Sequence, residues 1–99
     1  MESDLLKIIN HYTLMKQLKY IHSEYFELDE AIVIGEDRNE HLKSHGWNKD
    51  HIAEEIADIM VMLKQFQYYY GISDEQIEDI MKFKIKRQLE RIELEEKEG

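Results

Sequence analysis

Apolar residues recur at alternating spacings of three and four residues along three long segments of this 99-residue chain, 13–34, 50–70 and 73–93. This spacing places the apolar side chains on one face of a helix, so each segment is predicted to be an amphipathic helix. The chain has no proline and four glycines, which suits long helices and disfavours a many-stranded fold. We therefore predict an all-α, antiparallel four-helix bundle whose first helix is short, from Ser3 to Ile9.

Each long segment has one face that is predicted to enter the core. In the first segment this face comprises Leu14, Leu18, Ile21, Tyr25, Leu28 and Ile32, and in the second it comprises Ile52, Ile56, Ile59, Leu63, Phe66 and Tyr70. In the third it comprises Ile77, Ile80, Met81, Ile85, Leu89 and Ile92. Because a chain of this length forms only a thin core, we expect a second chain to cover part of these faces, in a homodimer or homotetramer.

Capping residues set the predicted ends of the helices. Thr13 and Ser73 are suitable N-caps, and Gln76 completes a capping box with Ser73. Gly35 and Gly71 are suitable C-terminal stops. The polar stretch that follows Gly35 lacks helical periodicity and is predicted to be a loop.

The composition excludes several classes of function. A formal net charge of -9 makes nucleic acid an unsuitable partner, because phosphate backbones need a basic surface. Without cysteine the chain has neither disulfides nor a cysteine-type zinc site. It contains no apolar run of the ~20 residues that span a membrane, and its N-terminus lacks a signal-peptide pattern. We expect a cytoplasmic protein with one domain, residues 1–99, and a frayed acidic tail at 94–99.

Two acidic pairs stand out. Glu24 and Glu27 lie three residues apart in the first long segment, and Glu55 and Asp58 lie three apart in the second. Each acid directly precedes an apolar position of its predicted core face, so the four carboxylates border that face. When the two faces pack together, the carboxylates converge, and each close pair repels by about 4 kcal/mol at an intermediate dielectric. A bound cation removes that cost.

Oxygen ligands favour Mg²⁺, Mn²⁺ or Ca²⁺ over zinc and iron. The Glu-x-x-His motif of di-iron bundles is absent from the chain. We therefore predict a site for Mg²⁺, with Mn²⁺ as a substitute. The alternative is an ordinary solvated surface, since most acidic residues on helices are exposed.

The same residues resemble the signature of a known family. Residues 23–27 (SEYFE) and 55–58 (EIAD) resemble the Glu-Glu-x-x-Glu and Glu-x-x-Asp motifs of the MazG-like all-α nucleoside triphosphate pyrophosphohydrolases. Lys84 and Arg87 resemble the family's terminal Lys-x-x-Arg, and the resemblance covers nearly the whole chain. The chain departs from the signature at Ser23, which stands in place of its first glutamate.

The resemblance implies a reaction. Enzymes of this family hydrolyse a (deoxy)nucleoside triphosphate between its α- and β-phosphates and release a nucleoside monophosphate and pyrophosphate. It implies that Glu24, Glu27, Glu55 and Asp58 are the catalytic residues and hold Mg²⁺, which activates water and neutralises developing charge. Ser23 leaves the positioning of the attacking water open.

Three cations share one face of the last helix, at spacings of three and four: Lys84, Arg87 and Arg91. With the resemblance, Lys84 and Arg87 are predicted to bind the polyphosphate. Arg91 is predicted to be a surface residue that pairs with Glu90 and Glu95.

Gln17 and Tyr20 continue the metal face toward the start of its helix, at successive spacings that lead to Glu24. They either read and stack a nucleobase or form a polar boundary and a core aromatic, and the sequence leaves both alternatives open. The run 68–70, three tyrosines, is predicted to serve an oligomer interface, where tyrosine is favoured.

Three residues of the predicted loop carry ring side chains of possible functional types. His41 and His45 have the spacing of helical zinc ligands, but a third ligand is missing and the segment is predicted to be a loop. Trp47 is predicted to hold that loop against the bundle.

Two further functions stay open. One is hydrolysis of a phosphoribosyl-ATP-like intermediate by the same site. The other is a non-catalytic module for helical dimerisation or partner binding, in which both acidic pairs merely flank ordinary bundle seams. Stabilisation by Mg²⁺ separates an enzyme from such a module.

Overall fold

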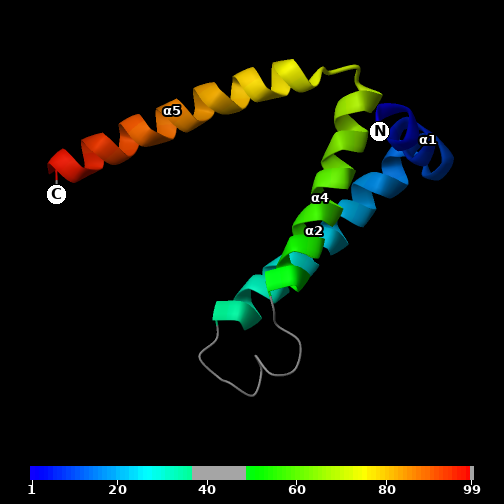
Figure 1. Cartoon of the computed structure of the whole chain (residues 1–99), viewed down its shortest axis with the longest axis horizontal. Coiled ribbons are helices and arrows are strands. Elements are labelled where there is room, and N and C mark those ends of the chain that lie inside the picture. The colour runs from blue at the N-terminus through cyan, green and yellow to red at the C-terminus, as the bar shows by residue number, and fades with distance from the viewer. Residues whose placement is uncertain (37–48, 99) are drawn as a thin grey trace.

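The computed structural model describes residues 1–36 and 49–98, and its regular structure there is helical throughout (Figure 1). In chain order the helices are α1 (Glu2–Tyr12), α2 (Leu14–Glu36), α4 (Lys49–Tyr69) and α5 (Asp74–Glu98). The all-α prediction, with a short first helix, is confirmed for the described residues. The predictions for His41, His45 and Trp47 lie outside them.

Side-chain caps begin two of the long helices, as predicted. At the start of α2, Thr13 Oγ1 accepts the backbone N–H of Lys16 at 3.3 Å. At the start of α5, Ser73 Oγ accepts the backbone N–H of Gln76 at 3.1 Å. These bonds satisfy N–H groups that have no partner within the helix, and they fix where each helix begins.

The bounds of α1 and the end of α2 differ from the predictions. Helix α1 begins at Glu2, so Ser3 lies inside the helix and is not its N-cap. It continues beyond Ile9 to Tyr12 and ends at Thr13, whose φ of 82° leaves the helical region while its N–H still donates to the Ile9 carbonyl at 2.9 Å. Helix α2 passes through Gly35, which is buried inside the helix and does not end it.

The predicted frayed tail is also wrong for the residues described. Residues 94–98 continue α5 as regular helix, and the helix does not end near Glu93. Glutamate, lysine and leucine are good helix formers, and Lys97 Nζ lies 3.6 Å from Glu93 Oε1 one turn earlier. Such pairs four residues apart stabilise an exposed helix.

The corner between α4 and α5 is closed by a glycine, as predicted. Gly71 has a φ of 69°, a left-handed conformation that glycine adopts without strain. Its N–H donates to the carbonyl of Tyr68 at 3.0 Å, and the N–H of Ile72 donates to the carbonyl of Gln67 at 3.0 Å. This pair of bonds is the Schellman motif, which satisfies the last carbonyls of α4.

Side-chain contacts of Asp74, the first residue of α5, stabilise this corner. Its Oδ1 lies 2.5 Å from Lys64 Nζ and accepts hydrogen bonds from Gln67 Nε2 at 2.8 Å and from the Tyr68 hydroxyl at 2.9 Å. These bonds, first of all that of Lys64, lower the pKa of Asp74 to about 2. The interface prediction for 68–70 is therefore wrong for Tyr68, which is buried within its own chain, whereas the other two tyrosines are exposed.

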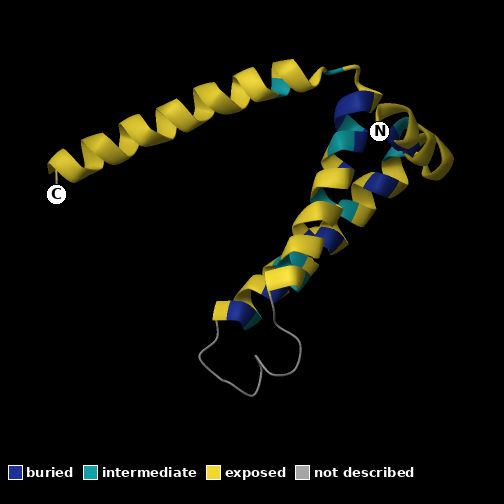
Figure 2. Ribbon diagram, in the orientation of Figure 1, coloured by how far each residue is buried: buried dark blue, intermediate teal, exposed yellow. Residues whose placement is uncertain are grey.

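Three of the helices pack together and the fourth leaves them. Helices α2 and α4 run side by side and antiparallel, and α1 packs against both (Figure 1). Beyond its first turn, α5 diverges from this body, and none of its described residues is buried (Figure 2). The prediction of a bundle of all four helices is therefore not met within one chain, because the locked corner directs α5 away.

The contact line between α2 and α4, called here the seam, differs from the predicted faces at every second position. Its residues, buried or half-buried, are Leu14, Gln17, Ile21, Glu24, Leu28 and Ala31 on α2 and Ile52, Glu55, Ile59, Met62 and Phe66 on α4. Half of the predicted positions are correct. At five of the other six positions the buried residue is the one directly before the predicted residue, and the sixth, Tyr70, follows an exposed residue. Polar residues such as Gln17, Glu24 and Glu55 therefore occupy the seam.

The displaced apolar residues are exposed. They form what is called here the second apolar face: Leu18, Tyr25 and Ile32 on α2, Ile56 and Leu63 on α4, and Tyr70 directly after α4. Five of them directly follow a seam residue, and Tyr70 follows Tyr69, which lies seven residues after the seam residue Met62. Hydrophobicity alone selected them for the core, but the helices pack with the preceding residue inward.

None of the described helices combines the length and the apolar character needed to cross a membrane.

Candidate metal centre between α2 and α4

The seam brings three carboxylates together. Glu24 on α2 and Glu55 and Asp58 on α4 each offer one oxygen atom, and these atoms lie within 4.8 Å of one another. Glu24 and Glu55 are only 5% and 8% exposed, while Asp58 is exposed. The group is therefore buried on its inner side and open to solvent on its outer side.

Two oxygens of this group have no partner in the described part of the chain. Glu24 Oε2 and Glu55 Oε2 are buried and accept no hydrogen bond. A buried carboxylate oxygen without a donor loses its hydration and gains nothing in return, which native folds rarely tolerate. A divalent cation would satisfy both oxygens at once, and carboxylates are the ligands that Mg²⁺ prefers. The residues therefore fit a metal ion.

Glu27 lies at the edge of the group. It is exposed and is outside the set of three that converge most closely. Its charge nevertheless reaches Glu55, whose pKa is raised first by burial and then by the nearby charges of Glu27 and Asp58. His51 acts in the opposite direction, because its Nε2 lies 3.9 Å from Glu55 Oε1. Both burial and the neighbouring carboxylates therefore disfavour the ionised form of Glu55, and one imidazole opposes them.

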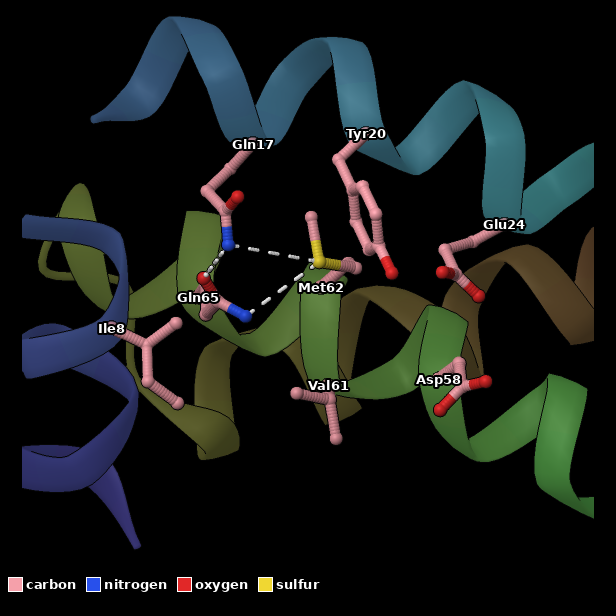
Figure 3. A pocket seen from close by; sticks show the side chains of 8 residues that line it. All are labelled: Ile8, Gln17, Tyr20, Glu24, Asp58, Val61, Met62 and Gln65. Atoms are coloured by element: carbon pink, nitrogen blue, oxygen red, sulfur yellow. Dashed lines mark hydrogen bonds between the residues drawn. The ribbon is translucent and has the colours of Figure 1, made fainter. Parts of the chain in front are cut away.

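Tyr20, one turn before Glu24 on α2, points its hydroxyl toward that carboxylate (Figure 3). A hydrogen bond to Glu24 is the main cause that raises the pKa of Tyr20, and the charges of Glu24, Glu27 and Asp58 add to it. Tyr20 is half exposed, so it is not the core aromatic of one sequence alternative. Its position is that of a polar wall beside the carboxylates.

A cavity of about 260 Å³ adjoins the carboxylates on this side (Figure 3). Gln17 Nε2 donates to Gln65 Oε1 at 2.9 Å across the seam, and Gln65 Nε2 approaches Met62 Sδ at 3.7 Å. The lining residues are Ile8, Gln17, Tyr20, Glu24, Asp58, Val61, Met62 and Gln65. The cavity thus combines paired amides with an aromatic hydroxyl and carboxylates.

Gln65 and Met62 are not among the site residues predicted from the sequence. A signal was present, because Gln17 precedes Glu24 by seven residues and Gln65 follows Asp58 by seven. Seven residues are two helical turns, so each glutamine shares a face with its carboxylate. Polar residues repeated at that spacing mark a face that hydrophobicity does not reveal.

The predicted phosphate-binding cations do not meet the carboxylates within one chain. Lys84 and Arg87 line a shallow groove of about 170 Å³ on α5 with Gln88 and Arg91, and α5 points away from the seam. Among the described residues these three cations form no ion pair. The prediction that Arg91 pairs with neighbouring glutamates is therefore wrong, and Arg91 shares the face of the other two.

No family model, curated protein or solved structure matches this chain. The resemblance to the MazG-like enzymes therefore stays a prediction, which rests on the residues of the two motifs.

Proposed function

We propose that this chain is a Mg²⁺-dependent nucleoside triphosphate pyrophosphohydrolase, with Mn²⁺ as a substitute metal, that releases a nucleoside monophosphate and pyrophosphate. The observation that supports it best is the pair of buried carboxylate oxygens, on Glu24 and Glu55, that no described group of the protein satisfies. The order and spacing of the two acidic motifs are the second support.

The donor set suits the metal. Glu24, Glu55 and Asp58 supply three oxygens within 4.8 Å of one another, and Glu27 adds negative charge from the edge of the group. When bound, Mg²⁺ supplies Lewis-acid stabilisation to the triphosphate and lowers the pKa of coordinated water. The exposed side of Asp58 leaves room for phosphate oxygens to approach from solvent.

The adjoining cavity suits the nucleoside. Gln17 and Gln65 hold each other in a fixed orientation through their 2.9 Å hydrogen bond. Amide groups read the donor and acceptor edges of a base, and the Tyr20 ring offers a surface on which a base can stack. We therefore favour the base-reading alternative for Gln17 and Tyr20, with the buried Gln65 holding Gln17 in place.

Lys84 and Arg87 would bind the polyphosphate from a second copy of the chain. The corner at Asp74 holds the chain's own α5 away from its own carboxylates. In an oligomer, α5 of the partner supplies the cations, and charge-assisted contacts to phosphate are worth about 1.5–3 kcal/mol each.

The test is a screen of nucleoside and deoxynucleoside triphosphates, with phosphoribosyl-ATP included, in which pyrophosphate release is detected with Mg²⁺ and with EDTA. We expect Mg²⁺-dependent release, reduced at least tenfold (~1.4 kcal/mol) by Glu55→Gln. Glu54→Gln is the matched control, because Glu54 is the neighbouring acid and is exposed. Absence of release with every substrate contradicts the proposal.

The second candidate is a non-catalytic dimerisation module. The second apolar face favours it, since six large apolar residues there are exposed in the single chain. This candidate predicts that Mg²⁺ changes neither the melting temperature nor any activity, while the chain still associates.

A further inference from the structure

The side-chain amide of Gln17 has only one end engaged by the protein. Its Nε2 donates to Gln65 Oε1 at 2.9 Å, so the nitrogen has a partner. Its Oε1 accepts no hydrogen bond from residues 1–36 or 49–98, although the residue is only 8% exposed. A polar atom in so buried a position is normally hydrogen-bonded. A donor that these residues do not supply has to come from water or from a ligand.

The sulfur of Met62 decides which end of this amide stays open. A thioether sulfur accepts hydrogen bonds and has none to donate. Gln65 Nε2 lies 3.7 Å and Gln17 Nε2 lies 4.0 Å from Met62 Sδ, so both nitrogens face an acceptor. Turning both amides over would place two oxygens at the sulfur and remove both of its donors. Gln65 and Met62 are 2% and 4% exposed, so water does not compensate for that loss, and the Gln17 oxygen is held outward.

The open oxygen adjoins the cavity of about 260 Å³ that Gln17 and Tyr20 both line. In Figure 3 it points away from Gln65, on the side of the Tyr20 ring. Ile8 and Val61 add apolar walls to the same cavity. An aromatic ring and apolar side chains suit a flat heterocycle, which stacks on the ring and places its edge at the amide.

The side-chain hydrogen-bond donors among the described residues of this cavity each have a partner. The nitrogens of Gln17 and Gln65 face an amide oxygen and a sulfur, and the Tyr20 hydroxyl bonds to Glu24. The polar atoms that remain open are acceptors: the Gln17 oxygen and, at the other end of the cavity, the carboxylates. The cavity is therefore selective for ligand groups that donate hydrogen bonds.

The cavity also gives a nucleotide a direction. The amides lie at one end and the carboxylates at the other (Figure 3). Gln17 and Glu24 are seven residues apart on α2, which is about 10 Å along the helix axis. An extended nucleoside has a comparable length between the edge of its base and its 5′ oxygen. With the phosphates at the carboxylates, as the proposed function requires, the edge of the base reaches Gln17.

We propose that the Gln17 oxygen selects a nucleoside triphosphate whose base carries an exocyclic amine, as adenine and cytosine do. This selection rests on the proposed function and specifies its substrate class. The amines of adenine and cytosine donate hydrogen bonds. Hypoxanthine and uracil have a carbonyl oxygen at the same position, and beside Gln17 that oxygen loses its hydration without finding a donor. Gln17 thus determines specificity, and Gln65 and Met62 position it.

Two pairs of substrates test this selection: ATP with ITP, and CTP with UTP. The first member of each pair carries the amine and the second carries the carbonyl. For each pair that the parent accepts, we expect kcat/KM for Mg²⁺-dependent pyrophosphate release to be roughly tenfold or more higher for the amino nucleotide. Calorimetric titration of analogues with a methylene bridge between the α- and β-phosphates should show the same order of Kd without hydrolysis.

Variants of the amide and of the sulfur test how the selection arises. Gln17→Met keeps the length of the side chain but removes the oxygen, so the preference for the amine should disappear. Met62→Leu conserves volume and removes the acceptor that orients Gln65, so the amides can turn over and the preference should fall. Met60→Leu is the matched control, because Met60 is 55% exposed on the same helix, and it should leave the preference unchanged. Circular dichroism checks that each variant keeps its helices.

The outcomes distinguish this selection from the proposed function. Hydrolysis with equal kcat/KM within both pairs, or faster hydrolysis of ITP or UTP, would overturn the selection and leave the function standing, whether or not the variants fold. A preference that survives Gln17→Met would also overturn it. Absence of release from every triphosphate contradicts the function, and titration of the analogues then decides: tighter binding of the amino members supports selection by Gln17, and equal or no binding overturns it.

Discussion

On both α2 and α4, a buried carboxylate is followed directly by an exposed apolar residue. Glu24 and Glu55 are buried in the seam, and the next residues, Tyr25 and Ile56, are exposed and apolar. An isolated chain would be more stable with this order reversed, because burying apolar area is favourable and burying unpaired carboxylates is costly. We propose that each feature has a partner that the single chain lacks, a cation at the carboxylates and an apolar surface at the exposed residues.

The largest effect is expected from experiments that test the carboxylates and the second apolar face separately. Mg²⁺ at 100 times its dissociation constant should stabilise the parent by about 2.7 kcal/mol, because it binds only the folded chain. Glu55→Gln should abolish this stabilisation and leave the dimer intact. Ile56→Ser, one residue later, should weaken the dimer and keep the response to Mg²⁺. Thermal unfolding and sedimentation measure the two responses, and a variant that loses both would show that the two features are not independent.

Removal of a basic side chain from α5 should have the next largest effect. Arg87→Ala should reduce triphosphate hydrolysis at least tenfold (~1.4 kcal/mol), mainly in kcat if the contact strengthens as charge develops. Arg91→Ala should now act in the same direction, because Arg91 lines the groove of Lys84 and Arg87. Lys86→Ala is the control, since Lys86 lies on the far side of α5. Equal small effects of all three substitutions would contradict a phosphate-binding role.

The same residues allow a test of which chain supplies the cations. Co-expressed Arg87→Ala and Glu55→Gln chains form mixed dimers, in which one site combines intact carboxylates with an intact partner α5. Each variant alone should keep about a tenth of the parent activity or less, and the mixture should recover about a quarter of it for a two-fold dimer with random pairing. No recovery would place carboxylates and cations in one chain.

A smaller effect is expected without metal. Glu24→Gln should raise the melting temperature of the metal-free chain by a few degrees, because an amide is easier to bury than an unpaired carboxylate. Glu30→Gln, on the same helix and exposed, should leave it unchanged. A lower melting temperature for Glu24→Gln would show that the hydrogen bond from Tyr20 outweighs the cost of burial.

The smallest effect concerns the corner that directs α5 away from the α2–α4 pair. The pKa of Asp74 is lowered from 3.8 to about 2 by Lys64, Gln67 and Tyr68. A lowered pKa means that the ionised form stabilises the fold above pH 3.8 and that this contribution is lost as the pH falls toward 2. Asp74→Asn should therefore be less stable than the parent at pH 5, and the difference should shrink between pH 4 and 2. A difference that does not change with pH would show that the ionised carboxylate has no part in it.

The sequence predicted the helices well and their contacts only in part. Capping chemistry is local, so Thr13, Ser73 and Gly71 identified their helix ends correctly. The carboxylates that converge were also found, because their spacing is a local pattern. Which face turns inward is decided by packing across the chain, and hydrophobicity selected Leu18 and Ile56 where Gln17 and Glu55 are buried. The direction of α5 depends on Asp74 and its three partners, whose contacts follow only from the folded corner.

The two unsatisfied carboxylates also affect how the folded chain opens. Backbone amides normally exchange with deuterium most slowly at the centre of a helix pair and fastest at its ends. In the metal-free chain, local separation at Glu24 and Glu55 returns both carboxylates to water, so opening costs least near the middle of the seam. The slowest exchange should then occur near Ile9 and Gln65, where α1 packs and burial is complete. A chain built in this way has its weakest point at the residues that would bind the metal, and the ion would enter by the motion that its binding then suppresses.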